Sequence, residues 1–126
     1  MKALLDTHIL LWWLADDPSL PVLAADAIAN PDVDVIVSAA SAWEIAIKRA
    51  AGRLEAPDDL LGALHANNFD SLSITVAHAL AAGRLPEHHS DPFDRVLIAQ
   101  ARTDGLTLIT VDDRFPEYDV DLLPLG

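Results

Sequence analysis

The chain has no cysteine among its 126 residues. It therefore has no disulfide framework, no thiolate metal site and no cysteine nucleophile, which fits a protein of the reducing cytoplasm. Basic residues are also scarce, since 8 lysines and arginines stand against 20 acidic residues and the formal charge is −12. This charge argues against a surface that attracts nucleic acid as a whole, although cations bound at a local site would reverse the sign there.

Long apolar runs are missing as well. The run that begins after Lys2 is interrupted by Asp6 and His8 and ends at Asp16, far short of a membrane span. We therefore expect this segment to be folded rather than to be a signal peptide, and we expect no membrane contact. The apolar fraction of 52% is enough for a core, and the length suits a single domain over residues 1–126.

The rest of the chain alternates between short apolar runs and longer segments with helical spacing. The apolar runs predict strands over residues 2–6, 34–37, 69–74 and 106–110, with an additional edge strand over 120–123. Helical spacing, together with start and stop signals, predicts helices over residues 7–15, 21–30, 38–51, 57–66, 75–82 and 92–104. This alternation predicts an α/β fold, a three-layer sandwich with a central, mainly parallel sheet.

Acidic residues stand where such a sheet is expected to bind its ligand, beyond the carboxyl ends of the strands. Asp6 ends the first predicted strand, and Glu44 lies in the second turn after the second strand. Asp94 lies in the first turn of the helix before the last strand, and Asp112 follows that strand. Four segments therefore each bring a carboxylate toward the same edge of the sheet.

Some of these acids also have a purely structural interpretation. Ser41 and Glu44 have the spacing of a capping box, and Asp91 before Pro92 has the position of a helix N-cap. Asp94 would complete that cap or complement the helix dipole. Taken singly, each of these positions is explained without a functional site.

The acids taken together are harder to explain in this way. Asp112 and Asp113 suit an ordinary turn, whereas Asp6 follows a buried apolar run and needs a partner or a cation. Converging carboxylates without a nearby lysine or arginine repel one another and raise each other's pKa. A divalent cation removes that conflict, and oxygen ligands favour Mg²⁺ or Mn²⁺ over zinc. Because such ions activate water and stabilise in-line attack at a phosphodiester, the acids indicate phosphoryl chemistry.

The same residues lie in four ordered blocks between Leu4 and Tyr118: LLDTHILLWWL, SAASAWEIAIKRAAGRL, LPEHHSDPFDRVLIAQA and LITVDDRFPEY. These blocks resemble the PIN domain and, more narrowly, the VapC-type toxins of bacterial toxin–antitoxin pairs. The resemblance implies a Mg²⁺- or Mn²⁺-dependent endoribonuclease that cleaves RNA and leaves a 5′-phosphate and a 3′-hydroxyl. It also implies a homodimer and a small antitoxin whose C-terminal arm lies across the active-site groove.

By this resemblance, the family's catalytic and metal-binding acids correspond to Asp6, Glu44, Asp94 and Asp112. In this hypothesis Asp6 and Asp94 bind the first ion, while Glu44 and Asp112 complete the site or hold a second ion. The spacing around the fourth acid varies among relatives, so its placement is open.

Four neighbours of these acids complete the predicted site. Asp91 is an additional acid typical of the subgroup, and Asp113 is adjacent to the fourth acid and competes with it for that place. Thr7 and Thr110 stand beside the acids and are expected to orient ligands or a water.

Two basic residues are expected to bind RNA. Lys48 lies one turn after Glu44, so it either contacts phosphate or forms an ordinary i,i+4 ion pair with that acid. Arg95, beside Asp94, is the second candidate. Arg49 points about 100° away from Lys48 around the helix and is not expected at the site.

Neighbouring histidines in the third block invite a different interpretation. His88 and His89, with Asp91, would offer ligands to zinc or iron. No other histidine is near in sequence, and their place in the block favours loop structure or substrate contact instead.

Three tryptophans offer rings that stack on bases, Trp12, Trp13 and Trp43. Their spacing on apolar helices favours packing in the core or at an interface. The helix that carries Leu11, Trp12 and Trp13 is therefore the expected dimer surface.

Other α/β proteins with acidic sites need residues that this chain lacks. A haloacid-dehalogenase-like phosphatase needs a second acid two residues after Asp6, where His8 stands. A receiver domain needs an aspartate after a central strand and a lysine after a late one, but Ser38 and Val111 follow these strands. A catalytically silent PIN-like module that binds RNA or protein is the remaining alternative, and the intact set of four acids argues against it.

Overall fold

The computed structural model describes residues 1–126 and contains a four-stranded sheet in the order β3-β2-β1-β4. The strands are β1 (Lys2–Leu5), β2 (Asp34–Ser38), β3 (Asp70–Leu72) and β4 (Thr107–Ile109), and every neighbouring pair is parallel. In the centre, Leu4 of β1 lies opposite Ile36 on one side and Leu108 on the other. Because all the strands are parallel, their carboxyl ends meet at one edge of the sheet.

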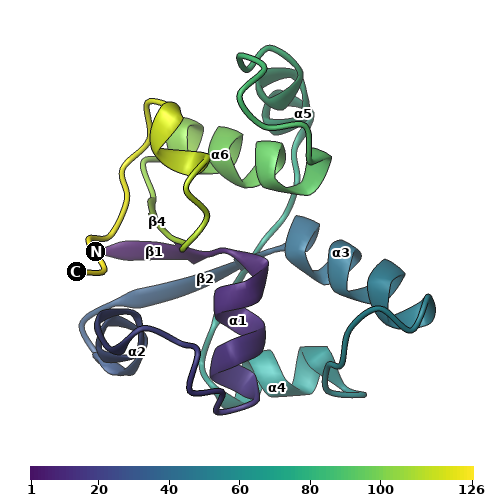
Figure 1. Cartoon of the computed structure of the whole chain (residues 1–126), viewed down its shortest axis with the longest axis vertical. Helices are drawn as coiled ribbons and strands as arrows, with labels where there is room; N and C mark the ends of the chain where they lie inside the picture. Colours follow the sequence, from purple (N-terminus) through teal and green to yellow (C-terminus); the bar gives the residue numbers. More distant parts are fainter.

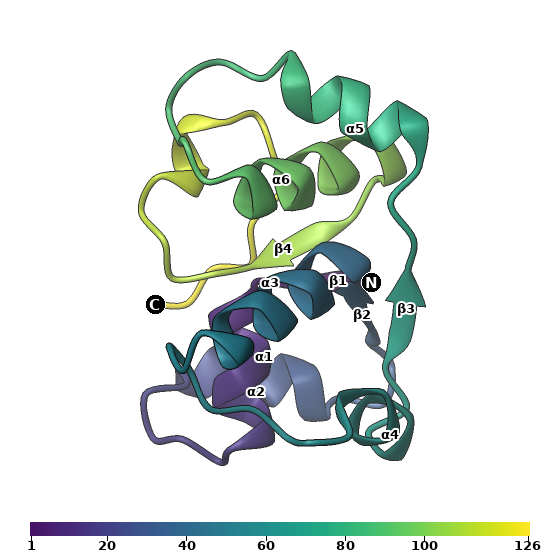
Figure 2. The ribbon, with the colours of Figure 1, turned by 90° about the vertical axis from the view of Figure 1, so that its right-hand side faces the viewer.

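Helices cover both faces of this sheet (Figure 1 and Figure 2). One face carries α1 (Thr7–Leu14), α2 (Val22–Ala29) and α4 (Leu60–Ala66), and the other carries α5 (Val76–Gly83) and α6 (Pro92–Asp104). α3 (Ala39–Ala50) continues from β2 beyond the carboxyl edge, and the 3₁₀ turn η1 (Phe115–Glu117) follows β4. The predicted α/β three-layer architecture is confirmed. No helix in it combines the length and the apolar character needed to cross a bilayer.

The alternation of side chains along β1 creates a separate core on each face. Ala3 and Leu5 belong to a cluster with Ile9 of α1, whereas Leu4 belongs to a second cluster with Leu97 of α6. All five of these side chains are fully buried, and burial of a leucine or isoleucine contributes roughly 1.5–3 kcal/mol each. The helices are therefore held firmly against the sheet, which positions the residues at its carboxyl edge.

The C-terminal segment differs from the prediction. The expected edge strand over 120–123 is reduced to an isolated parallel bridge between Leu108 and Leu122. β4 is short, Thr107–Ile109, and Pro124 follows the bridge, so the ladder cannot extend. The prediction of a strand here was wrong.

The start of α4 also differs, because the helix predicted over 57–66 begins at Leu60. The Asp59 carboxylate accepts a hydrogen bond from the Gly62 amide at 2.9 Å and so acts as the N-cap. Asp58 and Asp59 thus precede the helix instead of lying in its first turn, because a short acidic side chain competes for backbone donors at a helix start. The other predicted elements are present, with bounds shifted by at most two residues.

Candidate active site

The carboxyl edge of the sheet begins with Asp6, which follows β1 and precedes α1. Asp6 stands at the N-cap position of α1 but its side chain makes no cap hydrogen bond. Its Oδ2 instead accepts a hydrogen bond from Thr110 Oγ1, just after β4, at 2.6 Å. Asp6 is 5% exposed, so the neighbouring strands β1 and β4 fix a buried carboxylate at their common end.

Glu44 reaches the same edge from α3. Ser38, not Ser41, caps this helix by accepting from the Ala40 amide, so the predicted capping box of Ser41 and Glu44 was wrong. The helix begins earlier than that box requires, which leaves Glu44 in its second turn with its side chain buried. Glu44 Oε2 pairs with Lys48 Nζ at 2.5 Å, whereas Oε1 is buried and has no hydrogen-bond partner.

Thr7 and Ser41 connect the two helices that carry these acids. Thr7 Oγ1 donates a hydrogen bond to Ser41 Oγ at 3.0 Å, and both residues are buried. Thr7 therefore ties the start of α1 to α3, next to the acids on either side. Thr110 has the more direct role, because its hydroxyl contacts the Asp6 carboxylate and also accepts from the Asp112 amide at 3.0 Å.

Asp91 caps α6, as the sequence predicted. Its Oδ1 accepts hydrogen bonds from the amides of Phe93 at 2.8 Å and Asp94 at 3.2 Å. The Asp94 carboxylate is consequently not needed for the cap. It contacts His89 instead, with Oδ2 at 2.8 Å from Nε2.

His89 is the buried centre of the predicted histidine pair. Its Nδ1 accepts from the Asp91 amide at 3.2 Å, which leaves the proton on Nε2. Nε2 then donates toward Asp94 at 2.8 Å and toward Asp112 Oδ2 at 3.3 Å. The ligand atoms of these three residues lie within 4.8 Å of one another, the spacing of a metal site, but a protonated Nε2 positions carboxylates rather than binding an ion. His88 is exposed and stacks edge-on against Tyr118.

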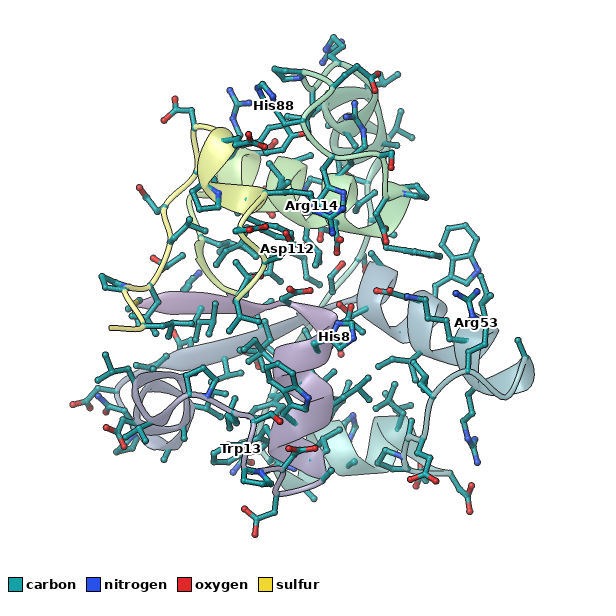
Figure 3. The ribbon with its side chains drawn as sticks, in the orientation of Figure 1. His8, Trp13, Arg53, His88, Asp112 and Arg114 are labelled. Atoms are coloured by element: carbon teal, nitrogen blue, oxygen red, sulfur yellow. The ribbon has the colours of Figure 1, made fainter.

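Arg114 is the residue that sequence reasoning missed. Its Nε and one terminal nitrogen donate to the two oxygens of Asp112 at 3.1 and 3.0 Å, a bidentate pair. Figure 3 shows Arg114 beside Asp112 at the carboxyl edge, with His8 below them. The VDDRF stretch contains the signal, since an arginine two residues after an acid can fold back onto it.

The electrostatics divide these acids into two kinds. Burial raises the pKa of Asp6, and burial raises the pKa of Asp94 to about 8, helped by the charges of Asp6, Asp91, Glu44 and Asp112. Burial also acts on Asp112, but the hydrogen bonds and charge of Arg114 outweigh it and lower the pKa of that carboxyl. Without a cation, Asp94 therefore keeps its proton near neutral pH.

The acids line one cavity of about 520 Å³, which also includes Asp91, Asp113, Lys48 and Arg114. The unpartnered Glu44 Oε1 is an oxygen that lacks a positive neighbour on its side of the carboxylate. Carboxylate oxygens without donors are the ligands that Mg²⁺ and Mn²⁺ prefer. The residues present thus fit a divalent cation, and no thiolate or thioether ligand lines the cavity.

The two candidate RNA-binding residues lie in different environments. Lys48 forms the i,i+4 pair with Glu44 and lines the acidic cavity. Arg95 donates instead to four backbone carbonyls, those of Ala82, Leu85, Pro86 and His89. Its guanidinium fastens the loop that carries His89, and this geometry does not favour phosphate contact. Arg49 pairs with Asp58, away from the acids.

The tryptophans on α1 contribute to the packing of the domain. Trp13 donates from Nε1 to Asn67 at 3.0 Å, and Leu11, Trp12 and Trp13 are half-buried against the first core cluster. Trp43 of α3 is 60% exposed. Part of the helix face that the sequence assigned to a partner thus packs inside the domain.

Comparison with known proteins settles the family. A family model of the PIN domain matches residues 3–121. The chain belongs to the PIN domain family. The PIN domain described here is also 33% identical over 118 residues to Ribonuclease VapC22 of Mycobacterium tuberculosis, covering 91% of this chain and 90% of the relative.

Solved structures share the fold of this PIN domain. The VapBC2 structure from Rickettsia felis, bound to a promoter DNA fragment, matches with a TM-score of 0.72 and 13% identity over 98% of both chains. A toxin–antitoxin complex from Klebsiella pneumoniae matches with a TM-score of 0.69 and 19% identity, again over 98% of both chains. At these identities the likeness concerns the arrangement of the backbone.

Proposed function

We propose that this PIN domain, one domain over residues 1–126, is a Mg²⁺- or Mn²⁺-dependent endoribonuclease and the toxin of a toxin–antitoxin pair. The observation that carries the proposal is the convergence of Asp6, Glu44, Asp94 and Asp112 from four segments on one cavity. The relative named as a ribonuclease supports the same activity. A catalytically silent binding module is not favoured, because nothing in such a module offsets the cost of burying these carboxylates together.

The proposed ion-binding atoms are the carboxylate oxygens that the protein leaves free. Thr110 occupies Oδ2 of Asp6 and His89 occupies Oδ2 of Asp94, so each acid keeps Oδ1 for a ligand. Glu44 Oε1 also has no hydrogen-bond donor. Asp112 is proposed as the fourth acid, although both of its oxygens accept hydrogen bonds from Arg114. A bound Mg²⁺ or Mn²⁺ would neutralise these charges, polarise the phosphodiester and activate water for in-line attack.

The surrounding side chains hold this arrangement in place. His89 fixes the orientations of Asp94 and Asp112 at the same time, and Arg114 fixes Asp112 from the solvent side. Lys48 neutralises one oxygen of Glu44 and is 25% exposed, so its ammonium is within reach of an RNA phosphate on the open side. Preorganised ligands reduce the cost of assembling the charged site when substrate arrives.

The proposed partners are RNA, an antitoxin and a second copy of the chain. The structural neighbour from Klebsiella pneumoniae is a toxin–antitoxin complex, which supports an antitoxin for this chain as well. An acidic cavity suits an arginine or lysine of such a partner. All of these partners would meet the protein in the cytoplasm, the compartment expected from the sequence.

For the homodimer, we propose a surface on α3 and α5 in place of the one predicted on α1. The exposed fractions there are 60% for Trp43, 45% for Ile47, 77% for Val76 and 57% for Leu80. These pairs lie at i,i+4 spacing, so each helix presents an apolar stripe to solvent. Exposed apolar side chains gathered in this way are typical of interaction surfaces.

A cleavage assay tests the function directly. Purified protein is incubated with a mixed RNA pool in Mg²⁺, Mn²⁺ or EDTA, and we expect cutting only with a metal. Asp94→Asn should lower the rate by roughly 10³-fold, within the range for loss of a group central to the chemistry. Asp26→Asn, at an exposed position of α2, is the matched control and should cut normally. Metal-independent cutting, or full activity of Asp94→Asn, would contradict the proposal.

A further inference from the structure

A second cavity lies between α1 and α3, directly beside the acidic one. It has a volume of about 340 Å³, within the roughly 300–1,000 Å³ of typical small-ligand sites. The two cavities share His8, Trp12, Glu44 and Lys48 in their linings, so they meet along a common wall. In Figure 3, His8 lies between Asp112 and Arg53, which belong to the two separate cavities. An extended ligand bound at the acids can therefore continue into this second cavity, which we call the α1–α3 cavity.

One wall of the α1–α3 cavity is aromatic. His8 and Trp12 are four residues apart on α1, so they share a face of the helix, and their ring centroids are 6.0 Å apart. His8 is exposed and Trp12 is half-buried, which leaves ring surface open to a ligand. Trp13, one residue on, turns about 100° away and packs against Phe69. Aromatic rings in this position are suited to stacking on a nucleobase.

The far side of the α1–α3 cavity carries a free cation. Arg53 is exposed in the turn after α3, and it takes part in no ion pair, whereas Arg49 is paired with Asp58. The lining also includes acids, but Glu44 is paired with Lys48 and Asp17 accepts from the Ser19 amide at 2.8 Å. Glu55 is left as an acceptor for the amino or hydroxyl groups of a nucleoside.

We propose that the α1–α3 cavity is a nucleotide subsite of the RNA-binding groove. It receives the nucleotide next to the cleaved bond, with its base against Trp12 and its phosphate on Arg53. The inference rests on the proposed ribonuclease function and adds to it the location of a neighbouring nucleotide. It also explains how a strongly acidic protein would bind RNA, because the free cation and the aromatic rings lie directly beside the acids. No positive charge over the whole surface is then needed.

Two pairs of variants test the subsite. Arg53→Ala removes the proposed phosphate contact, and Arg102→Ala, at an exposed position on α6, removes the same charge far from the cavity. Trp12→Leu removes the aromatic face while keeping an apolar side chain, and Trp12→Phe retains a ring that stacks. Urea unfolding of each variant shows that the domain is intact.

The readouts are the kcat and KM of RNA cleavage in Mg²⁺ and the quenching of tryptophan fluorescence on rapid mixing with a single-stranded RNA decamer. We expect Arg53→Ala to raise KM about tenfold, with kcat within about twofold, and to reduce the slope of log affinity against log salt by about one. Trp12→Leu should raise KM by about 5- to 150-fold. Trp12→Phe should keep a KM close to the wild type but lose the quenching, and Arg102→Ala should match the wild type throughout.

The outcomes separate this inference from the proposed function. A wild-type protein that cuts RNA, while Arg53→Ala and Trp12→Leu keep its KM and salt dependence, overturns the subsite alone. If those variants bind RNA normally and an arginine-bearing antitoxin peptide quenches Trp12 instead, the cavity belongs to the antitoxin and the inference is also overturned. A wild-type protein that neither cuts nor binds any RNA overturns the proposed function, and the subsite with it.

Discussion

His78 and His89 are both buried, and each contacts aspartate from another part of the chain. Each ring accepts a backbone N–H at Nδ1, from Thr75 for His78 and from Asp91 for His89, and each turns Nε2 toward carboxylate. The two clusters are therefore built by the same local rule. They differ in what else converges on them.

His78 meets a single acid, Asp104, at 3.2 Å. It forms a capping box with Thr75 at the start of α5, and Asp104 ends α6, so the contact locks two helices together. His89 meets two acids that share a cavity with Asp6 and Glu44. A histidine–aspartate contact therefore joins two helices at His78, whereas at His89 it forms part of the acidic cavity. The two clusters differ in the number of carboxylates that converge on them.

Removal of each histidine gives the largest contrast between the clusters. His89→Ala frees Asp94 and Asp112 to reorient, and we expect kcat/KM for RNA to fall about 10- to 100-fold, as for other groups that orient metal ligands. His78→Ala should leave kcat/KM unchanged while lowering the free energy of unfolding by about 1–3 kcal/mol, because buried partners lose their hydrogen bonds. Steady-state kinetics and urea unfolding measure the two effects. An equal loss of kcat/KM in both variants would show that the two histidine clusters do not differ in function.

The pH dependence of stability is the next largest effect and belongs to the His89 cluster. Burial raises the pKa of Asp94 to about 8, so without metal the folded chain binds this proton more tightly than the unfolded chain does. Between about pH 4 and 8 the unfolded state has lost a proton that the folded state keeps, and stability falls as pH rises; above about 8 the loss is complete.

Thermal unfolding in EDTA as a function of pH measures this dependence. Asp94→Asn should reduce the slope, leaving the contribution of Asp6, whose pKa burial also raises. It should raise the melting temperature at pH 8 by roughly a few degrees, even though it lowers the rate of cleavage. Asp104→Asn, the corresponding change in the His78 cluster, should do neither. A wild-type slope that survives in Asp94→Asn would assign the effect to another group.

The smallest effect is expected at Arg114, the exposed partner of Asp112. Its hydrogen bonds help hold the pKa of Asp112 below its usual range, but an aspartate is ionised near neutral pH even at its usual pKa, so Arg114→Ala should change the Mg²⁺ affinity only slightly. We expect a change of about twofold to fivefold, since solvent screens an exposed pair. Calorimetric titration with Mg²⁺ checks this value, and Arg102→Ala is the charge-matched control. If Arg114→Ala lowered the Mg²⁺ affinity more than His89→Ala does, Arg114 and not His89 would be the more important support of the acids.

The fold was largely predictable because its signals are local and repeated. Four short apolar runs and the helices between them were recognised, since alternation and capping leave their marks within a few residues. The predictions were wrong where the local structure depends on contacts with other segments. Residues 120–123 would pair only as far as the short β4 allows. The capping residue of α3 depended on which of Ser38 and Ser41 reached a free amide.

The acids of the candidate site could be predicted from the sequence, but the contacts of the side chains around them could not. Asp6, Glu44, Asp94 and Asp112 stand at fixed places relative to strands and helix starts, and the structure brings them to one cavity. Arg95 was predicted to contact RNA because it adjoins Asp94 in sequence, yet one helical step turns its guanidinium onto the backbone of the preceding loop. Adjacency in sequence says little about which way a side chain points.

The sequence by itself determined the layered fold and the set of acids, because hydrophobic period and position relative to strand ends are written in neighbouring residues. Only the tertiary structure decided that His89 contacts two of those acids and that His78 contacts an acid outside their cavity. These roles depend on contacts between residues 23 to 29 positions apart, such as His89 with Asp112 and His78 with Asp104. Such contacts exist only once the sheet and helices have packed, since packing sets which polar atoms meet away from water.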